Sequence, residues 1–158
     1  MQAFDTSVIV RTRRKLSRCP ELRVTSGRYW LHVDPPIEGG FPVQLRVHAR
    51  HFSVRLGGWI RRFDRDDDAI DCLEFGLSSA CRLLVEYRGS VEVAWTVEAR
   101  EYGTWQPHHR TARWLIPFWW RKRTAYLQNR TTLQSRANEA QRATVADAAE
   151  GDSFSVGL

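Results

Sequence analysis

The sequence has few cysteines, and none stands in a spacing typical of a disulfide framework or a zinc ribbon. There are three, an odd number, without a Cys-x-x-Cys pair. Cys19, Cys72 and Cys81 are therefore predicted to be free thiols, as in reducing compartments. Long apolar runs are also lacking. The apolar run before the first arginine covers only residues 8–10, which is too short for a signal-peptide core, and no run approaches the ~20 residues that span a bilayer. We expect a cytoplasmic protein.

Catalytic and metal-binding motifs are missing as well. No Gly-x-Ser-x-Gly, Gly-x-Gly-x-x-Gly or Gly-x-x-x-x-Gly-Lys pattern occurs. His48 and His51 would point to opposite faces of a regular strand, although a bulge could bring them together. His108 and His109 fall in a polar segment and are predicted to be exposed. We therefore predict no catalytic residue, no metal site, no cofactor and no small-molecule substrate.

Charge, in contrast, is abundant and unevenly distributed. The formal net charge is +6, and nearly all basic residues are arginines. Residues 107–133 contain six basic and no acidic side chains, residues 1–28 are also strongly basic, and the segment between them is mildly acidic. Two cationic segments that flank an acidic centre favour a partner that tolerates a positive surface.

The stretch 66–101 predicts a helix followed by a β-hairpin. Ile70, Leu73, Leu77 and Ala80 recur at three- and four-residue spacing, which places them on one helical face. Three aspartates at 66–68 crowd the first turn, where carboxylates are favourable. Alternating apolar and polar residues over 82–88 and 91–101 indicate two antiparallel strands with one polar face. We expect the helix to cover their apolar face.

The register of this hairpin follows from its alternation. Tyr87 should lie opposite Val91 and Val85 opposite Val93, because directly paired residues share a face. That pairing requires a three-residue loop, or a two-residue loop with a bulge.

Upstream, alternation over 29–33 and over 43–56 predicts further strands. The phase slips between Ala49 and Phe52, where either a bulge lies at Arg50 and His51 or two short strands meet, and we expect the bulge. A two-residue Gly-Gly loop at 57–58 then pairs 43–56 with 59–63 and sets Leu56 opposite Trp59.

Downstream, Pro117 restricts 114–123 to an edge strand or an extended segment. Residues 124–134 could form a short helix.

Together these patterns predict an α+β fold: an antiparallel sheet of about five to six strands, with one main helix over about 66–80 packed on one face. We divide the chain into a basic N-terminal arm (1–23), a single α+β domain (24–133) and a frayed or disordered tail (134–158).

The stretch 105–123 combines tryptophan and arginine, the residue types that dominate protein interfaces. We predict that this non-enzymatic module binds a protein partner or a second copy of itself. The candidate binding residues are Trp105, Arg110, Arg113, Trp114, Trp119, Trp120, Arg121, Lys122 and Arg123. Nucleic-acid binding through the basic segments 11–28 and 110–130 is the first alternative, and contact with a membrane surface through 114–123 is the second.

Overall fold

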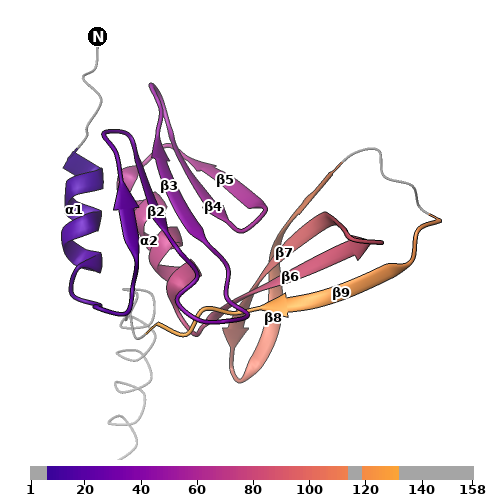
Figure 1. The fold of residues 1–158 in the computed structure, drawn as a ribbon. Helices are drawn as coiled ribbons and strands as arrows, with labels where there is room; N and C mark the ends of the chain where they lie inside the picture. Colours follow the sequence, from indigo (N-terminus) through magenta and orange to yellow (C-terminus); the bar gives the residue numbers. More distant parts are fainter. Residues whose placement is uncertain (1–6, 114–118, 132–158) are drawn as a thin grey trace, which may run out of the picture.

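The computed structural model describes residues 7–113 and 119–131, which form two helices and nine strands (Figure 1). In chain order these are α1 (Ser7–Leu16), β1 (Val24–Ser26), β2 (Trp30–Val33), β3 (Val43–Val47), β4 (Phe52–Leu56), β5 (Trp59–Phe63), α2 (Asp66–Leu77), β6 (Cys81–Arg88), β7 (Val91–Glu101), β8 (Thr104–Ala112) and β9 (Lys122–Leu127). They build an α+β fold, as predicted. The expected single sheet is wrong, however. There are two antiparallel sheets, one in the order β1-β2-β3-β4-β5 and one in the order β8-β7-β6-β9.

Helix α1 occupies a segment that we expected to be part of a loose basic arm. Its buried residues, Val8, Ile9, Thr12 and Leu16, recur at helical spacing, and the three apolar ones belong to the main core. The helix packs against β1 and β2. The apolar stripe is hard to recognise in the sequence because four basic side chains interrupt it.

Helix α2 begins at the three aspartates, as predicted, and ends at Leu77 rather than near residue 80. The backbone N–H of Ser78 closes the last turn by donating to the carbonyls of Glu74 and Phe75. The helix packs mainly on β3 and β4, not on the 82–101 hairpin as expected. The reason is that Leu45, Leu56 and their aliphatic neighbours present a fully buried layer on the first sheet.

The β4–β5 hairpin has the predicted register, with Leu56 opposite Trp59 and Phe52 opposite Phe63. The predicted bulge at residues 50–51 is wrong. Val47 pairs with Phe52, so the chain reverses through residues 48–51, and the His48 N–H donates to the carbonyl of His51 over 2.9 Å. The phase slip in the sequence therefore marks a turn between two strands.

The β6–β7 hairpin uses the two-residue loop with a bulge. Arg88 pairs with Val91 and Tyr87 with Glu92, and the register shifts between Glu86 and Tyr87. Both predicted pairings are therefore wrong: Tyr87 pairs with Glu92 and not with Val91, and Val85 pairs with Trp95 and not with Val93.

Strand β9 replaces the short helix that we had considered for 124–134. It pairs with β6 along its whole length, and its Thr and Tyr residues favour extended backbone. Strand β8 contains Pro107, which lacks a backbone N–H and is tolerated because β8 lies at the sheet edge.

The two sheets meet at the β4–β5 turn. A Cβ atom on Gly58 would lie 2.0 Å from the Trp95 ring, so only glycine allows β7 to pack this closely. Trp59 and His109 add an edge-to-face contact across the joint, with ring centroids 5.9 Å apart. Asn129, after β9, forms hydrogen bonds with Phe41, which lies just before β3, and with Gly76 of α2. From this joint the second sheet projects away from the body (Figure 1).

The predicted tail at 134–158 lies outside the described residues, as do residues 114–118 of the 114–123 segment. Within the part of the chain that the structure describes, no helix is long and apolar enough to cross a membrane.

Candidate functional site

The predicted binding residues do not form one surface. The second sheet has a face turned toward the first sheet and an outer face turned away from it, and its free end carries the β6–β7 turn. The outer face holds Trp105, Arg110 and Lys122, the other face holds Arg113 and Arg123, and the free end holds Trp119, Trp120 and Arg121. Trp114 lies outside the described residues.

On the outer face, Arg110 and Lys122 share one carboxylate. Their nitrogens lie 2.8 and 3.1 Å from the oxygens of Glu86. Hydrogen bonds from Arg110 and then from Lys122 lower the pKa of Glu86, against an opposing effect of burial. Two of the predicted cationic contacts are therefore already engaged in ion pairs.

Trp105 is committed to a stack within the sheet. The guanidinium of Arg82 lies 4.5 Å from the Trp105 ring and 4.1 Å from the Tyr126 ring, and Arg82 also pairs with Glu98. Arg82 is six residues from Arg88 along β6, which corresponds to roughly 20 Å of strand. Trp105 therefore cannot share a compact patch with Trp119 and Trp120 at the free end.

On the face toward the first sheet, both arginines cover aromatic rings. Arg113 lies 5.5 Å from the Trp95 ring and Arg123 lies 4.4 Å from the Tyr87 ring. Arg113 and Trp95 also line a cleft of about 470 Å³ between the two sheets. These arginines extend the aromatic surface while keeping their charge available to a ligand.

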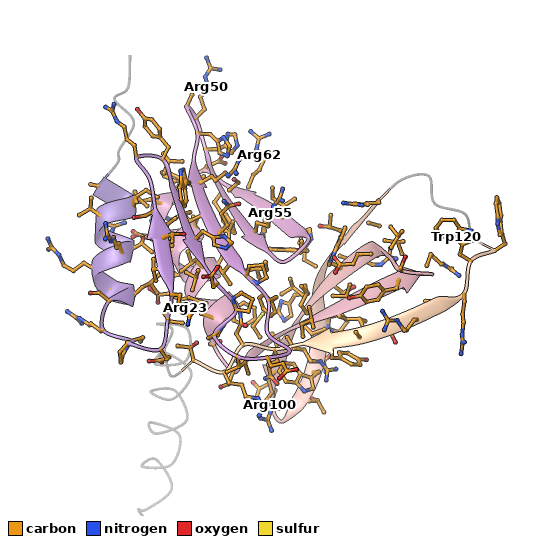
Figure 2. All side chains as sticks on the ribbon, in the orientation of Figure 1. Arg23, Arg50, Arg55, Arg62, Arg100 and Trp120 are labelled. Carbon is orange, nitrogen blue, oxygen red and sulfur yellow. The ribbon has the colours of Figure 1, made fainter. Side chains whose placement is uncertain are left out.

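Trp119, Trp120 and Arg121, which we call the tip, lie beside the β6–β7 turn. Trp119 is 72% exposed and Trp120 43% exposed. The backbone beneath them is held in place, since Arg88 donates to the carbonyl of Trp120 (3.2 Å) and the Gly89 N–H donates to that of Arg121 (3.0 Å). Figure 2 shows Trp120 at the far end of the projecting sheet.

The histidine pairs are separate features. His48 and His51 stack in the β3–β4 turn, with ring centroids 4.3 Å apart and planes 9° apart. His108 lies 2.7 Å from a carboxylate oxygen of Glu101. Over residues 7–113 and 119–131, no cluster of three or more His, Cys, Asp or Glu side chains could hold a metal ion.

Sequence reasoning missed a second surface, on the face of the first sheet that points away from the helices. We call it the basic face and define it by the residues Trp30, Gln44, Arg46, Ser53, Arg55, Ile60 and Arg62. Figure 2 shows Arg55 and Arg62 projecting from this side. The available signal was arginine on the polar side of successive strands, without any intervening acid.

Comparisons with protein-family models, with curated proteins and with solved structures find no match for this chain.

Proposed function

We propose that the chain is a non-enzymatic interaction module that binds a protein partner, or a second copy of itself, through the tip. The observation that carries the proposal is the exposure of the Trp119 indole on a backbone fixed by hydrogen bonds. We expect it to act in the cytoplasm.

The exposed indole is a substantial source of binding energy. A tryptophan side chain buries roughly 150–250 Å² when fully covered. Covering the exposed 72% of Trp119 would remove roughly 140 Å² from water, worth about 3.5 kcal/mol at 25 cal/mol per Å². Because the tip is already ordered, little of this energy is lost to fixing its conformation on binding.

Composition favours a protein over the two alternatives. Tryptophan beside arginine is typical of the few residues that dominate protein interfaces. Nucleic-acid binding through 11–28 and 110–130 is less favoured because Arg11 and Lys15 pair with carboxylates of α2, and Arg110 and Lys122 pair with Glu86. Membrane contact through 114–123 remains the second alternative, and part of that segment lies outside the described residues.

The test compares the wild type with the double variant Trp119→Ala/Trp120→Ala. Light scattering after size exclusion measures self-association, and affinity capture measures bound partners. We expect the double variant to lose the oligomer or the partner while keeping the wild-type melting temperature. The matched control is Tyr102→Ala, which removes a 96% exposed aromatic from the β7–β8 turn at the other end of the sheet.

The proposal fails if wild type and double variant are equally stable monomers that capture the same partners. It is replaced by the membrane alternative if the wild type floats with anionic vesicles and the double variant does not.

A further inference from the structure

We propose that the basic face of the first sheet binds single-stranded nucleic acid. This site shares no residue with the tip and does not depend on the function proposed for the tip.

The charge of this face is of one sign. The sequences of strands β1 to β5 contain arginines but no aspartate or glutamate. Arg46, Arg55 and Arg62 are all exposed, and no carboxylate among the described residues lies within salt-bridge distance of them. In contrast, several basic residues of α1 and of the second sheet's outer face form ion pairs with carboxylates. A polyanion would meet three uncompensated guanidinium groups here.

Strand pairing sets the spacing of these groups. Arg46 lies opposite Ser53, and Ser53 lies opposite Arg62, so the two arginines are two strands apart, or roughly 10 Å. Arg55 stands in the neighbouring row, between Gln44 and Ile60. The three arginines border a shallow pocket of about 190 Å³. They form a triangle that can contact successive phosphates of one strand.

Two histidines fix one corner of the triangle. Arg62 donates to Nδ1 of His51 over 3.2 Å, and the ring of His51 stacks on that of His48. His48 in turn lies 2.9 Å from the hydroxyl of Ser53 through its Nε2. Burial, and then the charges of Arg62 and His48, lower the pKa of His51 against an opposing effect of Asp64, which favours the neutral ring whose Nδ1 accepts this bond. The side chain of Arg62 is thereby held over the sheet.

Trp30 supplies a stacking surface at the edge of the same row. It pairs with Arg46 and is 40% exposed. One side of its indole packs on Gly27, where an added Cβ would lie 2.4 Å from Nε1, so the ring is supported from one side while part of it stays in solvent. Bases stack on such a ring only when they are unpaired, because the stacking faces of a duplex are already occupied. The pairing of Trp30 with arginine therefore points to a single strand and not to a duplex.

The expected strength of binding follows from the number of phosphate contacts. Three phosphate contacts to a single strand predict a slope of about −2 when the logarithm of the binding constant is plotted against the logarithm of the salt concentration. Loss of one arginine should make this slope less steep by about 0.7. Removal of the stacking ring should weaken binding about tenfold or more.

The experiment uses fluorescence anisotropy of the full chain with labelled thymidine and uridine oligonucleotides of about 12 residues. The test variants are Arg46→Ala/Arg55→Ala/Arg62→Ala and, separately, Trp30→Ala. The matched control is Arg13→Ala/Arg14→Ala/Arg18→Ala on and just after α1, which removes the same net charge from exposed positions elsewhere. Circular dichroism melts establish that each variant is folded.

We expect the basic-face triple variant to weaken binding to either oligonucleotide at least tenfold, the control triple to weaken it less than threefold, and Trp119→Ala/Trp120→Ala to leave it unchanged. The proposal is overturned if the wild type binds no oligonucleotide at low salt, or if both triple variants lose affinity equally, which would indicate net charge alone. It is also overturned if a duplex binds as tightly as the single strand, or if the face triple binds oligonucleotides normally and loses only binding to anionic vesicles.

Discussion

Replacing Lys15 with methionine should destabilise the protein far more than the loss of an ordinary surface lysine would. The Lys15 ammonium, 40% exposed, contacts a carboxylate oxygen of Glu74 on α2, whose side chain is only 1% exposed. Methionine keeps the aliphatic stem but removes the charge, which leaves the Glu74 carboxylate buried without its partner. This ion pair joins α1 to α2, so it tests whether the N-terminal helix is docked.

Removing one partner of a fully buried ion pair typically costs 3–5 kcal/mol. Because Lys15 is partly solvated, we take a smaller cost of about 2 kcal/mol. For a chain of this size such a loss lowers the melting temperature by roughly 4–8 °C. The double variant Lys15→Met/Glu74→Met should recover most of the loss, since it leaves no buried charge.

The assay is urea unfolding followed by circular dichroism, with the coupling of the two sites obtained from a double-mutant cycle. A change below 0.5 kcal/mol for Lys15→Met, or the same cost in the wild-type and Glu74→Met backgrounds, would refute the Lys15–Glu74 contact between α1 and α2.

Two further predictions concern other contacts. Asn129→Ala removes three buried 3.0 Å hydrogen bonds, two with Phe41 and one with the carbonyl of Gly76. We expect the free energy of unfolding, measured with urea, to fall by about 3 kcal/mol. A loss below 1 kcal/mol would contradict these contacts. The pKa of His51 should lie below its usual 6.5, mainly through burial and then through Arg62 and His48, and Arg62→Ala should raise it in an NMR titration. Since the unfolded chain then binds this proton more readily, His51 should reduce stability as pH falls through 6.5, and an unchanged pKa in Arg62→Ala would disprove the contact.

The predictions that the structure confirms rest on patterns among residues close together in the sequence. The stripe of Ile70, Leu73 and Leu77 predicts α2, because helical periodicity depends only on neighbouring residues. Gly57 and Gly58 likewise predict the β4–β5 turn and its register, which the structure confirms.

The wrong predictions concern which helices and strands pack against one another. Nothing in the sequence of α2 distinguishes β3 and β4 from the 82–101 hairpin as its partner, since both offer an apolar face. The stripe of α1 is only about two turns long and is embedded in basic residues. The Thr and Tyr residues of β9 favour extended backbone, but its pairing with the edge of β6 joins segments about 40 residues apart, which no local pattern shows.

The candidate sites, too, depend on contacts between residues that are far apart in the sequence. Exposure at the tip follows from its position at the free end of the second sheet, and its binding role stays a prediction. The basic face needs Arg46 and Arg62, sixteen positions apart, to flank Ser53. That proximity depends on the β3–β4 turn, where we had expected a bulge. An error in one turn was therefore enough to hide the whole face.

The two proposed binding surfaces, the tip and the basic face, can be distinguished in a single NMR spectrum. The seven tryptophans should give seven indole N–H signals, which single Trp→Phe variants assign. When a single-stranded oligonucleotide is added, we expect the signal of Trp30 to move and those of Trp119 and Trp120 to stay in place. Movement at Trp119 and Trp120 with none at Trp30 would contradict the assignment of both surfaces.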